Sequence, residues 1–346
     1  FHLTNLVLHT LNAILVFWLI TLLLRNTRGS LNFQCIAFIV ALLWAVHPLN
    51  TEAVAWASAR KDLLAGFFFL SSLLLYLRWR MGGIPKMFFW SIVLFFFGLL
   101  AKVTVLVLPV LLLLIDWWQG RSIDRRAIRE KTPYVLLSII FGIVALLGKT
   151  RNVASTSLLE SLLLGTNSII FYLQKLLLPS HLSVLYPYTN AISFGNPDLL
   201  FPFLLTISLL ILAWIARRNF QILTFTLAWY VLLLLPSFTA FRKGDDIELD
   251  LYFASDRYAY LPQIGILFLI ASLGAALCAH ARTHGKEMQR QKIAIGLVGA
   301  GVASLSFLSF RQAQTWNTTE TLFQNVIRSY PNSHIAHNNL GLFQQG

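Results

Sequence analysis

The sequence predicts an all-α, polytopic helical membrane protein, and three observations support this fold class. Of its 346 residues, 57% are hydrophobic and only 12% are charged, and the mean hydropathy is +0.69. A soluble protein of this length could not bury so much apolar surface, so lipid must be part of its solvent. The apolar residues also run unbroken, as in VLVLPVLLLLI (105–115), whereas strands of a membrane barrel would alternate.

Apolar stretches separated by polar connections predict about ten membrane-spanning helices. Several stretches are shorter than the ~20 residues that a bilayer usually needs, so we expect their polar flanks to add further helix. The expected spans are, in chain order, 3–24, 33–46, 63–77, 87–101, 103–118, 134–148, 199–216, 221–240, 262–279 and 293–310.

The segment 165–182 has two interpretations. It is long enough to cross the membrane, but it carries Lys175 and is interrupted by Pro179. If it crosses, every later span is inverted. We interpret it as re-entrant or interfacial, because this places the acidic loop 241–261 and the C-terminal segment on the outer side of the membrane.

Lysine and arginine usually mark the cytoplasmic loops of membrane proteins, and here they orient the first half of the chain. Loops on one side of the first five spans hold ten basic residues, whereas the opposite side holds only Arg60, Lys61 and Lys102. The opening residues are therefore expected to face outward. Beyond residue 149 the count is nearly equal, six against five, and decides nothing.

The net charge of +13 does not predict nucleic-acid binding in this setting. Basic loops in a membrane protein commonly meet anionic lipid headgroups, so membrane lipids are the expected partners. The two cysteines, Cys35 and Cys278, both lie in apolar runs and indicate neither a disulfide framework nor a metal site. The chain begins at Phe1 without an initiator methionine, which we interpret as a cut point within a longer protein.

The character of the chain changes after residue 310, which divides it into a transmembrane domain (1–310) and a polar, amphipathic tail (311–346). Pro331 is expected to end a helix. Ala336, Leu340 and Gly341 then match the opening of a tetratricopeptide repeat. One repeat cannot bury its own apolar face, so further repeats and a repeat-bound protein partner are expected. The alternative is a short amphipathic tail that lies on the membrane.

A polar patch between two apolar runs, AVHPLNTEAVAWASARKDLL (45–64), is the first candidate for a functional site. Pro48 suits the first turn of a helix, and Asn50 or Thr51 is placed to cap the next helical segment. A helix over 51–62 would place Glu52, Trp56 and Arg60 on one face. It would pair Ser58 with Asp62 on another face. Either these charges rim a pocket with His47, or they are a solvated turn.

A second polar cluster, FRKGDDIELDLYFASDRYAYLPQIG (241–265), follows the eighth expected span. Its acidic part has oxygen ligands suited to a hard divalent cation, but the spacing matches no complete calcium loop, so no metal site is predicted. The acidic residues of that part are Asp245, Asp246, Glu248 and Asp250.

The end of this cluster is more informative than its acidic part. Asp256 and Arg257 stand together where a helix enters the membrane, and a lipid phosphate is a natural partner for such an arginine. Tyr258 and Tyr260 suit an aromatic belt at the membrane surface. Lys102, in a short turn between two spans, either extends to the outer surface or neutralises a phosphate near the outer leaflet.

Five segments, taken together and in order, resemble one known family. They are FHLTNLVLHTLNAILVFWL, HPLNTEAVAWASARKDLL, AKVTVLVLPVLLLLIDW, FYLQKLLLPSHLSVLYPY and SDRYAYLP. The family is that of the transmembrane-and-tetratricopeptide-repeat O-mannosyltransferases and their bacterial relatives, with the GT-C fold. HPLNTEAVA and DRYAYLP are the most specific parts, and we expect a bacterial-type member that is truncated at both ends.

The resemblance implies an integral membrane enzyme that moves a sugar, typically mannose, from a polyprenyl-phosphate carrier to a protein hydroxyl. The transfer would take place on the periplasmic or lumenal face of the bacterial inner membrane, or of the endoplasmic reticulum in a eukaryote. No cofactor is implied, and a metal requirement is undetermined. A carboxylate would act as general base, while basic residues would hold the phosphate that leaves as an anion.

The resemblance also implies roles for individual residues. The expected catalytic acid lies in an outer loop upstream of Phe1, so residues 1–346 alone are expected to be inactive. Glu52 and Asp256 are the candidate catalytic residues within the chain, and an acid that often follows the lysine of the AK pair is replaced by Val103. The residues expected to bind substrate are His47, Glu52, Lys102, Arg257, Tyr258 and Tyr260.

Two other functions remain open from the sequence. A transporter or flippase for lipid-linked sugars would need internal symmetry and polar groups at mid-membrane depth. No convincing internal repeat is present, and the notable charges gather at one rim. A non-catalytic scaffold that displays repeats at the membrane is the second alternative. An acidic residue in the outer loop before Phe1 would favour the enzyme over the scaffold.

Overall fold

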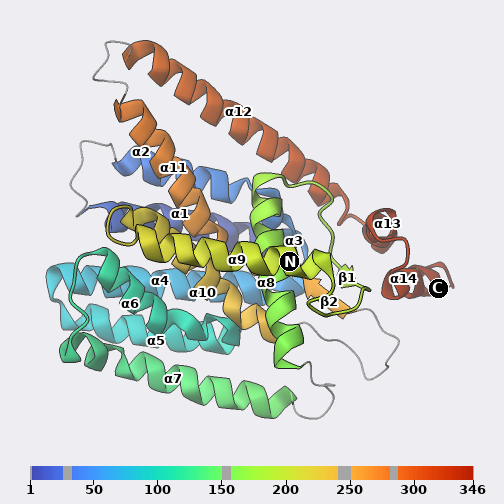
Figure 1. Cartoon of the computed structure of the whole chain (residues 1–346), viewed down its shortest axis with the longest axis horizontal. Helices are drawn as coiled ribbons and strands as arrows, with labels where there is room; N and C mark the ends of the chain where they lie inside the picture. Colours follow the sequence, from blue (N-terminus) through green and yellow to red (C-terminus); the bar gives the residue numbers. More distant parts are fainter. Residues whose placement is uncertain (1, 26–32, 150–156, 241–250, 281–286, 346) are drawn as a thin grey trace.

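The computed structural model confirms an all-α, polytopic helical protein (Figure 1). It describes residues 2–25, 33–149, 157–240, 251–280 and 287–345. The helices of the first part of the chain are α1 (His2–Leu24), α2 (Phe33–Ala45), α3 (Thr51–Ala55), α4 (Arg60–Gly82), α5 (Pro85–Ala101), α6 (Leu108–Trp118) and α7 (Arg125–Lys149). They are followed by α8 (Leu158–Leu177), α9 (Pro197–Ala216), α10 (Gln221–Leu234), α11 (Gln263–His280), α12 (Glu287–Gln314), α13 (Thr319–Ser329) and α14 (His334–Gln345).

Short 3₁₀ helices and one pair of strands connect the long helices. The 3₁₀ helices are η1 (Pro48–Asn50), η2 (Ala57–Ala59), η3 (Val103–Val107), η4 (Leu235–Ala240) and η5 (Asp256–Ala259). Strands β1 (Tyr186–Tyr188) and β2 (Leu251–Ala254) pair antiparallel, with Tyr186 opposite Ala254. Because β2 leads directly into η5, this pair positions the Asp256–Arg257 segment.

Six described helices are long and apolar enough to cross a bilayer, which makes the protein multi-pass. They include α1, α7, α9 and α12, and the pair α2 and η1–α3, bent by 55°, adds a seventh if it is one span. The helices 85–101, 103–118 and 263–277 are apolar but shorter. The total of about ten spans therefore stays a prediction.

Helix α8 runs across the bundle, whereas α4, α5, α7 and α9 all run lengthwise in the same view (Figure 1). Ser157 and Glu160 form a capping box at its start, each side chain accepting a hydrogen bond from the other residue's backbone N–H. It buries Leu163, Leu164 and Tyr172 on one side and leaves Leu158 and Leu162 exposed on another. This amphipathic helix suits the interfacial interpretation of 165–182, which stays a prediction.

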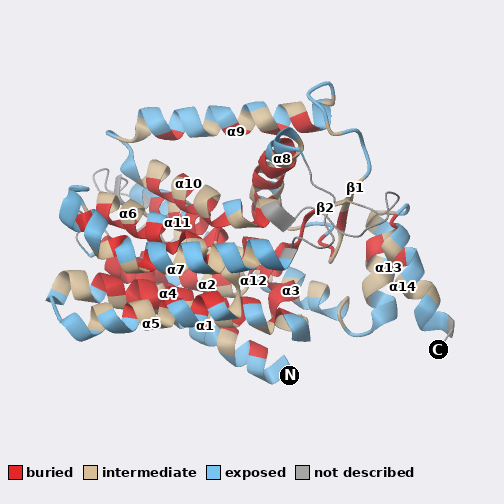
Figure 2. Ribbon diagram, turned by 90° about the horizontal axis from the view of Figure 1, so that it is seen from below, coloured by how far each residue is buried: buried red, intermediate tan, exposed pale blue. Residues whose placement is uncertain are grey.

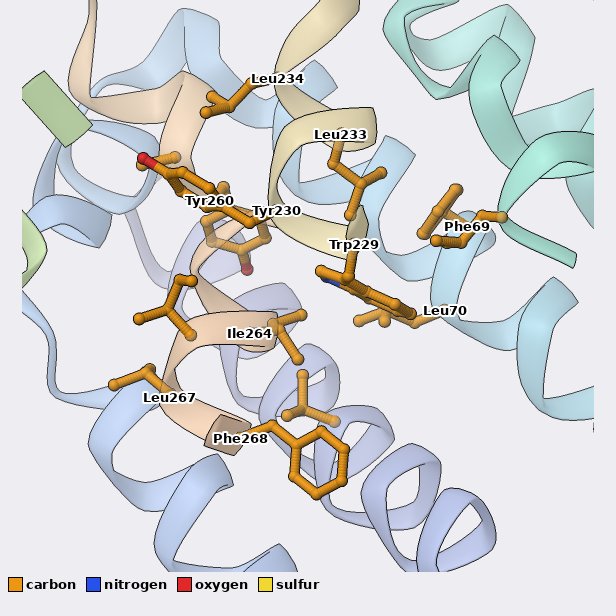
Figure 3. Close-up of a cluster of buried hydrophobic side chains, with 14 of the residues drawn as sticks. Phe69, Leu70, Trp229, Tyr230, Leu233, Leu234, Tyr260, Ile264, Leu267 and Phe268 are labelled. Carbon is orange, nitrogen blue, oxygen red and sulfur yellow. The ribbon is translucent and has the colours of Figure 1, made fainter. Parts of the chain in front are cut away.

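The core lies where the helices face one another, while their outer faces are exposed (Figure 2). Trp229 and Tyr230 of α10 pack there with Tyr260, with Phe268 of α11 and with Leu70 of α4 (Figure 3). The outer face of α7 is apolar; its exposed residues include Ile139, Ile140, Ile143, Val144 and Leu147. Such exposed apolar faces are expected where the surrounding solvent is lipid.

Close helix packing depends on Gly265 at the start of α11. A Cβ atom there would lie 2.8 Å from the carbonyl oxygen of Thr226 and 2.8 Å from the ring of Trp229. The indole N–H of Trp229 also donates to the carbonyl of Leu261 at 3.2 Å. Only a residue without a side chain lets α10 and α11 approach this closely.

The segment 51–62 is not one continuous helix, so the predicted single face of Glu52, Trp56 and Arg60 is wrong. Trp56 has an extended backbone, with φ −80° and ψ 118°, between α3 and η2. Asn5 of α1 stabilises the break, because its side-chain amide donates to the carbonyls of Val54 and Trp56, both at 3.1 Å. The break directs the chain into α4.

Pro48 occupies the first turn of η1 as predicted, and His47 caps this turn. Asn50 stands at the N-cap position of the next helix, α3, as predicted, but its side chain makes no capping hydrogen bond there. The Nδ1 atom of His47 accepts a hydrogen bond from the Leu49 N–H at 3.2 Å. Asn50 instead donates from its side chain to the carbonyl of Trp44 at 2.6 Å.

The tail forms two helices, α13 and α14, that pack on each other. Val326 of α13 and Ala336 of α14 are buried. Helix α13 ends at Ser329, two residues before Pro331. Helix α12 continues through residue 310 to Gln314. The tetratricopeptide-repeat assignment and the division at 310 stay predictions.

Candidate functional site

The sequence-predicted polar residues meet at one end of the bundle, where η1, α3, α4, η3 and η5 come together. The site end is on the right in Figure 1, near α3, β2 and the tail. Contacts of η1 and α3 with η5 bring together segments that are about two hundred residues apart in the chain.

Glu52 and Arg257 form the central ion pair. Oε2 of Glu52 accepts a hydrogen bond from the backbone N–H of Arg257 at 2.9 Å, and Oε1 accepts a second one from Nη1 of the guanidinium. The Glu52 side chain is 1% exposed and that of Arg257 is 18% exposed. Both carboxylate oxygens are therefore engaged by Arg257, and Glu52 positions the arginine from behind.

Two aromatic rings complete the surroundings of Arg257. The guanidinium carbon lies 5.1 Å from the ring centroid of Trp56 and 4.9 Å from that of Tyr258. Burial acts to lower the pKa of Arg257, but the Glu52 carboxylate outweighs it and raises that pKa above its ordinary value. The group is therefore a permanent, partly exposed cation held between two π faces.

A second ion pair, Lys102 with Asp62, lies beside the first. Nζ of Lys102 donates to Oδ1 of Asp62 and lies 4.8 Å from the ring centroid of Tyr258. The Lys102 side chain is 17% exposed and that of Asp62 is 4% exposed. Although Val103 follows Lys102 in the sequence, an acid reaches this lysine from the first turn of α4.

Asp62 is the site residue that sequence reasoning missed. Its Oδ2 atom is buried and has no hydrogen-bond partner among the described residues. The sequence feature that could have identified it is the ARKDLL stretch, where Asp62 is the acidic residue in the first turn of α4. Its partner, Lys102, lies 40 residues later, so the pairing depends on how α4 packs against α5.

The two ion pairs border one recess of about 480 Å³, a volume that includes the part open to solvent. Its described lining comprises Asp62, Ala65, Lys102, Thr104, Val105, Leu233, Ser237, Arg257, Tyr258, Tyr260, Leu261 and Pro262. Four predicted substrate-binding residues thus share a single recess: Lys102, Arg257, Tyr258 and Tyr260.

Tyr260 lines the recess with its ring, while its hydroxyl group faces α1. This hydroxyl lies 2.9 Å from Nδ1 of His9 and accepts a hydrogen bond from the Asn12 amide at 3.0 Å. The ring also packs against Gly66 of α4, where an added Cβ would lie 3.0 Å from Tyr260 Cε1. Tyr260 therefore connects α1, α4 and η5 under the recess.

Asp256 and His47 are buried beside the recess rather than within its described lining. Oδ1 of Asp256 accepts a hydrogen bond from the Tyr186 hydroxyl at 2.6 Å. Burial, and then the negative charge of Glu52, raise the pKa of Asp256 well above its usual 3.8. Nδ1 of His47 accepts a hydrogen bond from the Leu49 N–H, and Nε2 lies 3.0 Å from the carbonyl oxygen of Leu176. The contact with Leu176 connects η1 to α8.

The acidic residues Asp245, Asp246, Glu248 and Asp250 lie outside the described residues. Within the described ranges, no three His, Cys, Asp or Glu side chains stand close enough to hold a metal ion.

A further buried ion cluster, which sequence reasoning also missed, occupies the opposite end of the bundle. Asp116 of α6 accepts hydrogen bonds from Tyr76 at 3.0 Å, from Arg121 at 3.0 Å and from Lys131. Glu130 completes the cluster by accepting from Arg121 at 2.5 Å. These charges satisfy one another and connect α4, α6 and α7.

A protein O-mannosyl-transferase of Caenorhabditis elegans, F38B6.6, is 23% identical over 354 aligned positions, which cover 99% of this chain and 47% of that protein. Protein O-mannosyl-transferase TMTC1 of Homo sapiens is 40% identical over 78 residues, 22% of this chain and 8% of that protein. Tmtc2 of Drosophila melanogaster is 33% identical over 138 residues, 38% and 14% respectively.

The chain is similar to protein O-mannosyl-transferases. It spans about half the length of the Caenorhabditis elegans relative and a smaller part of the others. These relatives are animal proteins, so they do not support the expected bacterial type. No family model matches the chain, and no solved structure matches it.

Proposed function

We propose that this chain is the membrane part of a glycosyltransferase that moves mannose from a polyprenyl-phosphate carrier to a protein hydroxyl. One relative aligns with almost the whole chain and others align with parts of it, and all are named protein O-mannosyl-transferases. The donor, the acceptor and the outer, periplasmic or lumenal, face are parts of the proposal. So are the GT-C fold and a tail that binds a protein partner.

One observation in particular supports an anionic donor. Two cations, Arg257 and Lys102, are 18% and 17% exposed at one recess, whereas the carboxylates that pair with them are 1% and 4% exposed. Each cation is therefore more exposed than the acid that pairs with it, so the guanidinium of Arg257 and the ammonium of Lys102 are the charged groups most accessible to a ligand. A phosphate ester at the membrane surface matches this arrangement.

The chemistry of transfer suits the same groups. When the sugar leaves its carrier, negative charge develops on the phosphate, and cations fixed in advance stabilise that charge. The guanidinium of Arg257 is held by Glu52 and by two rings, so little reorganisation is needed when charge develops. No nucleotide-binding motif is required, because the donor is a lipid phosphate.

The acid–base group is less well placed within this chain. Glu52 has both oxygens engaged by Arg257, and Asp256 accepts from Tyr186. Both remain candidates, but each acts more readily as a positioning group. The proposal therefore keeps an additional catalytic acid outside residues 1–346.

Transfer of mannose from polyprenyl-phosphate mannose to an acceptor peptide, catalysed by the full-length protein in membranes, tests the proposal. Replacing Arg257 by Ala is expected to lower kcat about 10²–10³-fold, as for loss of one donor to a developing charge. Glu52→Gln should lower it less, because the arginine remains but is held less firmly.

Arg218→Ala is the matched control, because Arg218 is exposed and lies beyond the far end of α9. Its rate should equal that of the wild type. Wild-type turnover in both Arg257→Ala and Glu52→Gln would remove these residues from the mechanism. Absence of transfer in the wild-type protein would overturn the proposed function itself.

A further inference from the structure

Asp62 holds a buried oxygen atom that the fold leaves without a partner. Oδ1 accepts from Lys102, whereas Oδ2 has no hydrogen bond among the described residues. Buried polar atoms are almost always hydrogen-bonded, and an unsatisfied carboxylate oxygen is especially costly. The position of Asp62 in the first turn of α4 favours a negative charge there but does not satisfy this oxygen.

The oxygen belongs to a side chain that lines the recess. Among the described lining residues, Asp62 is the one carboxylate, next to Lys102, Arg257 and the ring of Tyr258. Glu52 and Asp256, the acids expected from the sequence, are engaged behind it by Arg257 and Tyr186. Asp62 is thus the acid best placed to meet a bound molecule.

The neighbouring groups indicate the chemistry of that molecule. Phosphate oxygens suit the two cations, whereas an anionic carboxylate repels phosphate and accepts hydrogen bonds only from donors. A ligand that satisfies the whole recess therefore combines a phosphate with a hydroxyl group. A glycosyl phosphate has both, and so does a donor phosphate lying beside an acceptor hydroxyl.

We propose that Asp62 is the substrate-facing carboxylate of this site, and that its Oδ2 accepts a hydrogen bond from a substrate hydroxyl while Arg257 and Lys102 hold the phosphate. The inference rests on the proposed function. The hydroxyl comes from one of two sources, the carried sugar or the acceptor. No bond is made or broken in this step, because Asp62 binds and orients the hydroxyl.

Asp62→Asn is the sharpest variant. Its amide oxygen can still accept from Lys102, but the NH₂ group then occupies the place of Oδ2 and is only a donor. The shape and the lysine contact are kept, while the acceptor is removed. Asp62→Glu keeps the charge and displaces the acceptor by one methylene, so it provides a second variant with an intact ion pair.

Asp124→Asn is the matched control. Asp124 is exposed beyond the other end of the bundle, and its side chain accepts from the Ala127 N–H at the start of α7. An asparagine can make the same contact. All variants are checked for an unchanged thermal transition in nanodiscs before binding is measured.

The experiment compares two lipids on the full-length protein: polyprenyl phosphate without a sugar, and polyprenyl-phosphate mannose. If the hydroxyl is on the carried sugar, Asp62→Asn should weaken binding of the mannosyl lipid about ten- to a hundredfold. Binding of the bare lipid phosphate should stay within about twofold. Asp62→Glu should be weakened in the same direction, and Asp124→Asn should match the wild type.

If the hydroxyl is on the acceptor, both lipids should bind Asp62→Asn normally, and the KM for the acceptor peptide should rise about tenfold or more. Either pattern supports the proposal and identifies the source. Unchanged lipid affinities together with an unchanged acceptor KM would overturn it and leave the proposed function standing. A wild-type protein that binds neither lipid would overturn both.

Discussion

Arg257 and Glu52 lie 205 residues apart in the chain and yet share two hydrogen bonds at the site. Each partner makes the other tolerable in a buried position, since an unpaired charge there costs about 3–5 kcal/mol. Asp256, one residue before Arg257, forms no ion pair with a cation among the residues that the structure describes. It accepts instead from the neutral hydroxyl of Tyr186, and this difference between neighbours leads to a prediction at the residue scale.

Replacing Asp256 by Asn should flatten the dependence of stability on pH. Burial, and after it the charge of Glu52, raise the pKa of Asp256 in the folded protein. The folded state then keeps a proton that the unfolded chain releases above its ordinary value near 3.8. The stabilising contribution is therefore complete below that value and is lost as the pH rises through the folded-state pKa.

Thermal unfolding in detergent, measured at increasing pH from about 3.8, the ordinary pKa of an aspartate, measures the effect. The wild-type melting temperature should fall with rising pH more steeply than that of Asp256→Asn, in which Tyr186 can still donate to the amide oxygen. Asp198→Asn, at an exposed carboxylate of the same end, serves as control. Equal flattening in both variants would contradict the assignment to Asp256.

At the scale of elements, the site depends on how closely a few helices approach one another. Helix α11 begins directly after the recess residues Tyr260, Leu261 and Pro262, and Gly265 sets its distance from α10. On the same helix, Gly274 is exposed, and an added Cβ there would meet nothing within 4 Å. The two glycines therefore form a natural matched pair.

Gly265→Ala is expected to destabilise the protein by about 1–3 kcal/mol, because the added methyl group collides with the Thr226 carbonyl and the Trp229 ring. Gly274→Ala should instead be neutral or stabilising by up to about 1 kcal/mol, since alanine favours helix over glycine. Chemical denaturation in detergent distinguishes them. Equal stabilities of the two variants would show that α10 and α11 do not pack as described.

At the scale of the whole molecule, the two ends of the bundle differ in character. The connections 83–84, 119–124 and 217–220 lie at the left end in Figure 1, while the recess elements and the tail lie at the right end. This arrangement results because α8 runs across the bundle, so that α7 ends and α9 begins at the same end. If α8 instead spanned the membrane, the connection 217–220 would lie on the opposite side of the membrane from 119–124.

Single cysteines test this arrangement in a background with Cys35→Ser and Cys278→Ser. Ser122→Cys and Asn219→Cys should react with a membrane-impermeant maleimide from one side of the membrane, and Ser58→Cys and Ser193→Cys from the other. All four positions are exposed. Labelling of Ser122→Cys and Asn219→Cys from opposite sides would mean that α8 spans the membrane.

Much of this protein can be predicted from local sequence. Hydropathy identifies the membrane helices because the free energy of transfer to lipid is nearly a sum over neighbouring residues. The rarity of charge in such a chain also identifies Glu52, Lys102 and Arg257 as residues of interest. The break at Trp56 escaped this reasoning, because it depends on hydrogen bonds from Asn5.

The pairing of charges was decided only by the tertiary structure. Local patterns reveal that acids and bases are present, but not that Glu52 meets Arg257 or that Asp62 meets Lys102, since these contacts join segments 205 and 40 residues apart. Helix packing determines which groups face each other and which oxygen remains free. For that reason, sequence alone identified the cations of the recess, whereas the fold was needed to identify Asp62.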